Sequence, residues 1–320
     1  MIDRPGYDVK LPIQFKLLTM STSAPPALQF VETEHTTKLV YCVNKYKLPQ
    51  GYFSWQKTLS VLRPSINTAL TTLNKHGENW FKKKLFRSPD SIYARCGYTA
   101  CRVLCADVPP ICISEKILES FLKTDVPSIE TPNYPLPAFM FYLPMKASKT
   151  ISNDLDVYSI FIVPSKNSGM LDAVCITNKK YILHEISCSW ETNLRDEESF
   201  KDLDEETLNV VNKVERIIKN AILAYTYEKK YVKDADESET TFSKGFKDSS
   251  DKPMPFRWLG KDFIQSVSKS KAKTLNDSTS KQRNKVRSHW RRGHWHTVCS
   301  GTKRKERQVR WFKPVFINGD

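Results

Sequence analysis

Apolar residues recur at helical spacing in three segments of the N-terminal half of the chain. The first segment, 64–77, opens with a proline and closes with a glycine, which is typical of a helix with proline in its first turn. The second, 88–105, opens with Ser-Pro-Asp, a favourable helix start. The third, 114–122, opens with a serine that is placed to cap it. The pattern therefore predicts three helices in this half.

The period changes further along the chain, where short runs rich in β-branched and aromatic residues alternate with turn signals. The runs cover 139–143, 157–163, 171–176 and 181–186. Asn and Gly residues separate them, as at 167–169, so we predict an antiparallel meander. A long helix follows, because acidic residues at 204–206 suit a helix N-terminus and apolar residues from Leu208 to Tyr225 fall on one face.

Together these elements predict an α+β fold. We expect N-terminal helices with an antiparallel β meander and a long helix, then a linker and a basic C-terminal module that resembles a β-hairpin. Three parts are predicted: a recognition body (1–232), a mostly polar linker (233–285) with a short apolar patch at 254–267, and a module rich in His, Trp and Arg (286–320).

The positive charge of the chain is concentrated at its C-terminal end. The 320 residues carry a formal net charge of +15. Residues 261–320 hold 16 Lys and Arg against 4 Asp and Glu, which leaves 34 against 31 for the first 260 residues. Such asymmetry indicates a contact with nucleic acid or another polyanion at the charged end. A solvated basic tail that maintains solubility is the competing interpretation.

The sequence also predicts where the protein acts. No segment approaches the roughly 18 to 20 consecutive apolar residues that a membrane span needs. The opening residues, Met-Ile-Asp-Arg-Pro-Gly, lack the basic and then apolar pattern of a signal peptide. We therefore expect a cytoplasmic location and no membrane partner.

The segment 286–318 combines arginine, histidine and tryptophan in a pattern that suits two strands joined by a basic turn. In the first strand, His294 and His296 would point to one face and Trp295 to the other. Guanidinium groups bind phosphate oxygens through two hydrogen bonds, and tryptophan rings stack on unpaired bases. The tail is thus predicted to contact RNA, although each tryptophan could instead cover a hydrophobic core. The predicted RNA-contacting residues are Arg287, Arg291, Arg292, Trp295, Lys303, Arg304, Arg307, Arg310 and Trp311.

His294 and His296 are also the candidate catalytic residues, because a pair of imidazoles can act as general base and general acid near neutral pH. A metal-independent ribonuclease needs such a pair and a cation for the phosphorane charge, a role open to Arg291, Arg292 or Arg310. The competing interpretation, which we favour, makes both histidines scaffold residues held by hydrogen bonds. The sequence therefore leaves open whether the protein is an enzyme.

A zinc site formed by His289, His294, His296 and Cys299 is a further interpretation of this cluster. The spacing of these four residues matches no ligand pattern that zinc chemistry justifies. None of the eight cysteines of the chain forms a Cys-x-x-Cys pair. We therefore predict no metal and no other cofactor.

Residues 291–296 read Arg-Arg-Gly-His-Trp-His. Small and aromatic residues follow this run at characteristic spacings. The signature residues, apart from the arginines, histidines and tryptophans already named, are Gly293, Gly301, Pro314, Phe316 and Asn318. The pattern resembles the C-terminal signature of the type V-A anti-CRISPR family that lowers the messenger RNA of the effector nuclease during translation. Trp290 and the Lys-Arg-Lys turn at 303–305 depart from that signature.

The resemblance implies an anti-CRISPR inhibitor that a phage or plasmid carries into a bacterial host cell. It further implies that the body recognises the emerging N-terminal end of the effector nuclease and that the tail engages RNA or the ribosome. Loss of the effector mRNA would follow. An RNA-binding or RNA-cleaving regulator of the interferase type, with no CRISPR target, is one alternative. A structural DNA-associated protein of a mobile element is the other.

Overall fold

The computed structural model describes most of the chain between residues 46 and 318, together with two short segments before it. The described ranges are 16–17, 30–31, 46–76, 89–126, 131–147, 151, 156–164, 170–177, 183–190, 204–240, 255–269, 288–302 and 305–318. The molecule is an α+β protein with mixed sheets, as the sequence predicts.

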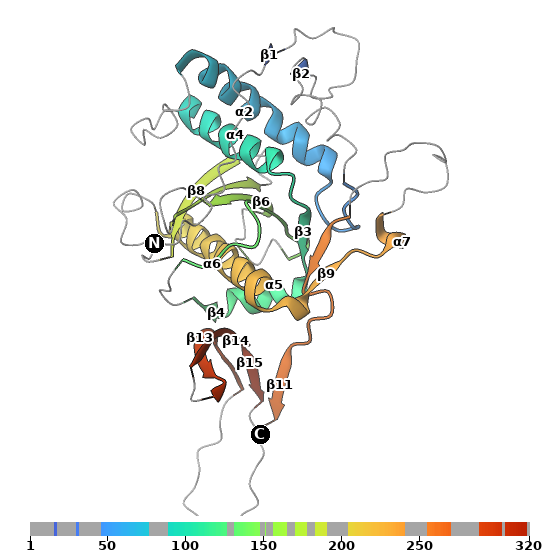
Figure 1. Ribbon diagram of the computed structural model, residues 1–320, viewed down its shortest axis with the longest axis vertical. Coiled ribbons are helices and arrows are strands. Elements are labelled where there is room, and N and C mark those ends of the chain that lie inside the picture. The colour runs from blue at the N-terminus through green and yellow to red at the C-terminus, as the bar shows by residue number, and fades with distance from the viewer. Residues whose placement is uncertain are drawn as a thin grey trace, which may run out of the picture.

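The centre of the fold is a mixed sheet of seven strands in the order β8-β7-β6-β5-β3-β10-β9 (Figure 1). In chain order the strands are β3 (Pro110–Ile113), β5 (Phe139–Tyr142), β6 (Val157–Pro164), β7 (Met170–Thr177), β8 (Leu183–Ser189), β9 (Val232–Asp234) and β10 (Arg257–Leu259). Strands β5 to β8 form the predicted antiparallel meander. Strand β3 lies parallel to both β5 and β10 and so extends the sheet beyond the meander.

Helices cover both faces of this sheet, because its central strands bury side chains on both sides (Figure 1). The helices are α2 (Trp55–His76) and α4 (Pro89–Cys105) on one face, and α5 (Glu115–Leu122) and α6 (Glu205–Tyr227) on the other. Strand β5 shows the alternation directly. Phe139 and Phe141 pack in the cluster that contains α5 and α6, whereas Met140 and Tyr142 pack in the cluster that contains α2 and α4.

The first helix is longer than the sequence pattern predicts. It begins at Trp55, so the prediction of a helix start at Pro64 is wrong, and the proline lies inside the helix. An interior proline removes one helical hydrogen bond and costs about 3 kcal/mol. The turns before it bury Trp55, Leu59 and Leu62, and burial contributes roughly 1.5–3 kcal/mol per large apolar side chain. The gain from this apolar surface exceeds the cost of the proline.

The other predicted helices form near their expected limits. Helix α4 begins at Pro89. Helix α6 is capped by Asp204, whose carboxylate accepts a hydrogen bond from the backbone N–H of Thr207 at 2.7 Å. Ser114 stands at the N-cap of α5, but its hydroxyl donates to the carbonyl oxygen of Gly260 at 2.5 Å instead of capping the helix. The serine thereby ties α5 to the end of β10.

The apolar patch predicted within the linker, 254–267, supplies an inner strand of the sheet. Strand β10 lies between β3 and β9, with Phe256 and Leu259 fully buried. Gly260 follows with a φ of +82°, and a Cβ atom there would lie 2.7 Å from the side chain of Ile117. Only glycine suits both the backbone and the space. Part of the predicted linker is thus integral to the body.

The C-terminal strands form two further sheets of three strands each. The first has the order β14-β13-β4 and the second has the order β11-β15-β12. Their strands are β4 (Thr124–Asp125), β11 (Ser266–Lys269), β12 (His289–Arg291), β13 (Gly293–Ser300), β14 (Glu306–Phe312) and β15 (Val315–Asn318). Short elements complete the description: β1 (Lys16–Leu17), β2 (Phe30–Val31), η5 (Lys229–Tyr231) and α7 (Glu237–Thr240).

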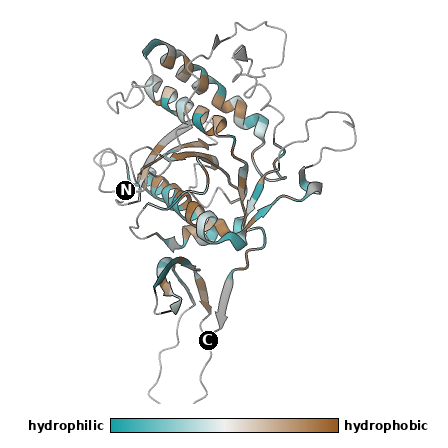
Figure 2. Cartoon of the chain, in the orientation of Figure 1, coloured by the Kyte–Doolittle hydropathy of each residue, from teal (hydrophilic) through white to brown (hydrophobic). Residues whose placement is uncertain are grey.

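The helices and central strands differ in hydropathy from β13 and β14. Figure 2 shows hydrophobic positions along the helices and the central strands, and hydrophilic positions over β13 and β14. Among the described helices, none is long and apolar enough to cross a membrane.

Candidate nucleic-acid interface

Strands β13 and β14 form an antiparallel pair with seven matched positions. Residues that lie opposite each other share a face of such a pair, and neighbours along a strand alternate. His294 is opposite Phe312, and His296 is opposite Arg310. These four side chains form what we call the outer face. Trp295 is opposite Trp311 on the inner face, in agreement with the alternation that the sequence predicts.

The inner face packs into the body. Trp295 is 3% exposed and Trp311 is 7% exposed, and both belong to the core cluster that contains α5 and α6. Their rings stack with centroids 5.8 Å apart, and Trp311 also stacks on Phe263 at 5.5 Å. Rings buried in this way cannot stack on RNA bases. The structure therefore favours the alternative interpretation, in which these two tryptophans cover a hydrophobic core and do not contact bases.

Each buried indole N–H has a partner in the body. The Nε1 of Trp295 donates to the side-chain oxygen of Asn220 at 2.7 Å, and the Nε1 of Trp311 donates to the hydroxyl of Thr124 at 3.2 Å. The amide nitrogen of Asn220 in turn donates to the carbonyl oxygens of Phe121, Thr124 and Arg216 at 2.9–3.3 Å. A buried polar network of this kind specifies a single packing arrangement of the hairpin against the body.

Gly293 explains one position of the signature. Strand β13 runs parallel to β4 here, and the backbone N–H of Gly293 donates to the carbonyl oxygen of Lys123 at 3.0 Å. A Cβ atom on Gly293 would lie 2.5 Å from the hydroxyl oxygen of Thr124 and 2.7 Å from Cδ of Pro314. The close approach of β4, β13 and Pro314 therefore requires glycine. Gly301, with a φ of +77°, serves the turn between β13 and β14.

The outer face exposes an aromatic pair. The rings of His294 and Phe312 stack with centroids 5.1 Å apart and 7° between their planes. His296 meets the same phenylalanine edge to face at 6.3 Å. Phe312 is 41% exposed, and Arg310, on the same face, donates to the side chain of Gln308 at 3.2 Å. Phe312 was not among the residues predicted to contact RNA. Its signal was the alternation itself, since inward tryptophans leave this ring outward.

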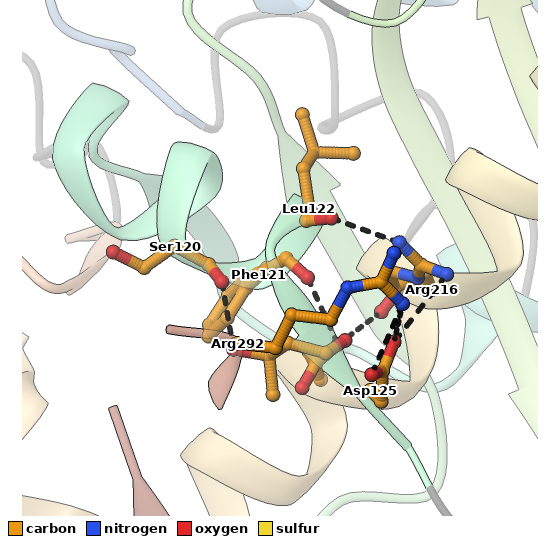
Figure 3. A network of polar contacts seen from close by, with 8 residues as sticks. Ser120, Phe121, Leu122, Asp125, Arg216 and Arg292 are labelled. Carbon is orange, nitrogen blue, oxygen red and sulfur yellow. Dashed lines mark hydrogen bonds and ion pairs between the residues drawn. The ribbon is translucent and has the colours of Figure 1, made fainter. Parts of the chain in front are cut away.

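Arginines lie at the corner between the hairpin and the body (Figure 3). Arg216 donates to the carbonyl oxygen of Leu122 at 2.9 Å and pairs with Asp125 at 3.7 Å. Arg292 approaches the same carboxylate at 3.4 Å. Its side chain is 74% exposed, and an exposed pair of this kind contributes about 0–1 kcal/mol. Arg292 can therefore exchange this partner for a phosphate at little cost.

A second cation lies against the adjacent strand. The ammonium group of Lys123 sits 3.8 Å from the ring centroid of Trp290, which in turn contacts the ring of Phe316 at 5.2 Å. The indole of Trp290 thus has a cation on its ring and Phe316 beside it. Phe316, a signature residue, serves the packing of β12 against β15.

The remaining candidates are placed as follows. Arg291, Arg292, Arg307 and Arg310 are exposed. Arg287, Lys303 and Arg304 lie outside the described residues, and Asn318 is described only as the last residue of β15, opposite Lys269. Within the described ranges, no group of three or more His, Cys, Asp or Glu side chains is placed to hold a metal. Cys299 is on the face opposite to His294 and His296, so these residues do not converge.

Comparison with known proteins identifies one family. Residues 106–319 match the model of the family described as anti-CRISPR type V subtype A2. The match extends from the end of α4 through the central sheet to the C-terminal strands. Neither the curated proteins nor the solved structures contain a significant match.

Proposed function

Since the chain belongs to the anti-CRISPR type V subtype A2 family, we propose that it inhibits a type V-A effector nuclease while that nuclease is being translated. The body recognises the nascent effector polypeptide, the basic C-terminal strands engage RNA or the ribosome, and the effector mRNA is lost. A phage or plasmid gene acting in the bacterial cytoplasm fits this role.

The family match carries the proposal. It spans both the central sheet and the hairpin, so the two proposed contact regions belong to one family unit. The charge distribution supports the division of labour between them. The first 260 residues are close to balanced, whereas the last 60 carry 16 cationic against 4 anionic side chains. A polyanion would be drawn to the C-terminal strands and not to the body.

The test is to express the protein beside a type V-A effector and follow the effector mRNA. Three transcripts are compared: the natural one, one recoded with synonymous codons, and one whose N-terminal region is read in a shifted frame. The second keeps the peptide and changes the RNA, while the third does the reverse. We expect the first two mRNAs to be lost and the third to persist.

Each outcome has a meaning. Loss of the frame-shifted mRNA would show that the peptide is not what is recognised. Persistence of all three would contradict the proposed function. A transcript without its start codon serves as the control for translation, and it should persist.

The exposed arginines are expected to set the salt dependence of RNA binding. Replacing Arg291 and Arg292 together with glutamine should weaken binding and reduce the slope of log affinity against log salt by about 1.4, since each phosphate contact on a single strand contributes about 0.7. Titrations of a labelled RNA at several salt concentrations measure this. The matched control removes two exposed lysines of α2, Lys57 and Lys75, and should leave the slope unchanged. An unchanged slope in the arginine variant would remove these residues from the interface.

One observation favours a second candidate function, RNA cleavage by the chain itself. His294 and His296 share the exposed outer face with the guanidinium of Arg310, which is the set of groups that a metal-independent ribonuclease needs. Within the described residues, no hydrogen bond joins either imidazole to a carboxylate. Asp125 lies opposite His294 in the pairing of β4 with β13, but it pairs with Arg216 and Arg292 instead, so no carboxylate orients the imidazole.

We therefore expect the purified protein to leave naked RNA intact in the absence of metal, and the mRNA to be lost through a recruited nuclease. Gel analysis of a labelled RNA with wild-type protein and with His294→Asn decides the question. Cleavage by the wild type that disappears in His294→Asn, with the melting temperature unchanged, would make the protein an enzyme.

A further inference from the structure

The outer face of the hairpin presents a large exposed aromatic ring in cationic surroundings. Phe312 lies on an edge strand, β14, and stacks with one side on the imidazole of His294. At 41% exposure, much of this ring faces solvent, while the tryptophans on the opposite face of the same hairpin are buried. Phe312 is thus exposed, although the inner face of the same hairpin buries two other aromatic rings.

The groups around this ring are those that bind a phosphate backbone. Arg310 lies on the same face two positions along the strand, about 7 Å away in an extended chain. His296 lies opposite Arg310. Arg291 and Arg292 are exposed just before the hairpin. Each guanidinium group can bind phosphate oxygens through two hydrogen bonds while a base occupies the neighbouring ring.

The acidic groups near this surface do not cancel its charge. Asp125 lies opposite His294 in the pairing of β4 with β13, and its charge is already balanced by ion pairs with Arg216 and Arg292. Glu306 lies at the far end of the hairpin, opposite Ser300 and beside Lys305 and Arg307. The face around Phe312 therefore presents cations and rings together. An apolar partner protein would not match that charge, and a duplex would hide the faces of its bases.

We propose that the outer face is a stacking platform for an unpaired segment of RNA. One base extends the stack of His294 and Phe312, and Arg310 and the arginines before the hairpin bind the adjoining phosphates. This assignment rests on the proposed function, in which the C-terminal strands engage RNA, and names unpaired RNA as the substrate and Phe312 as the base-binding residue. The tryptophans act through packing and touch no base.

The experiment measures the affinity of the full chain for a labelled oligouridine, which lacks base pairs, and for an RNA duplex of the same length. Phe312→Ala should weaken oligouridine binding by about 5- to 150-fold, the range that loss of one stacked base predicts. Phe312→Leu keeps an apolar side chain without a ring and should weaken binding similarly. Phe312→Trp keeps the ring and should bind at least as tightly as the wild type.

The matched control is Tyr93→Ala, which truncates a ring of similar exposure, 43%, on α4. It should leave the affinity within about twofold, since it removes no stacking partner of the RNA. Melting temperatures of all variants show whether the fold is kept. Equal binding by wild type and Phe312→Ala, or duplex binding as tight as oligouridine binding, would overturn the platform.

Effector mRNA levels in cells separate the two proposals. If the wild-type protein lowers the mRNA but binds no oligouridine, the platform is wrong and the proposed function stands. If oligouridine binding depends on Phe312 but the mRNA persists, the platform stands and the proposed function is wrong.

Discussion

Replacing Trp295 with alanine should lower the free energy of unfolding by about 3–5 kcal/mol, the cost of truncating a large buried aromatic side chain. The ring is 3% exposed and stacks on Trp311, and its N–H is bonded to Asn220. The substitution opens a cavity where the hairpin meets the body and leaves a buried oxygen without its donor. Urea denaturation followed by circular dichroism measures the change.

His296→Ala is the matched control, because it lies on the same strand with an exposed side chain. It should change the free energy of unfolding by no more than about 0.5 kcal/mol. A cost below about 1 kcal/mol for Trp295→Ala would mean that the hairpin contributes little to the core and is not seated as described.

The second large effect is expected at Asn220, which is fully buried. Asn220→Leu keeps a similar volume but removes the partner of the Trp295 N–H and of the Thr124 carbonyl oxygen. We expect a loss of about 2–4 kcal/mol in the free energy of unfolding, because each buried polar group left unpaired costs about 1–3 kcal/mol.

A double-mutant cycle isolates the bond between Asn220 and Trp295. Trp295→Phe keeps a large ring and removes the N–H group. In the Asn220→Leu background it should therefore cost about 1 kcal/mol less than in the wild type, since no unpaired donor remains. Additive effects would show that the contact at 2.7 Å does not contribute to stability.

Local patterns were sufficient to predict the meander and most helices. Strands β6 and β7 carry β-branched and aromatic runs with turn residues between them, and α6 has its cap, acidic first turn and apolar face in order. Such features act between near neighbours in sequence. The apolar patch around β10 was predicted, but not as a strand, because β10 has only three residues and its partner β3 is far away in the chain. Nothing local distinguishes such a strand from a linker.

Local sequence patterns were also insufficient to predict the candidate nucleic-acid interface in full. Alternation along β13 and β14 separates the tryptophans from the histidines, but it does not say which face is covered. The answer depends on residues at distant positions in the chain. Asn220 and Thr124 accept hydrogen bonds from the two indole N–H groups, and Glu228 accepts one from the backbone N–H of Trp311. Once that face is assigned, Phe312 becomes the exposed ring. The arginines of the predicted set that the structure describes are also exposed: Arg291, Arg292, Arg307 and Arg310.

The pairing of β4 with β13 also sets the order in which the protein can be completed during its own synthesis. Trp311 bonds to a threonine 187 positions earlier in the chain, and β10 must insert beside β3 before the central sheet is whole. Contacts of such long range form late and slow the folding of a domain. A nascent chain that has not yet been extended through β14 lacks the strand whose Trp311 packs on Phe121 and Tyr231. A protein proposed to act on nascent chains thus cannot complete its own core until β13 and β14 have been synthesised.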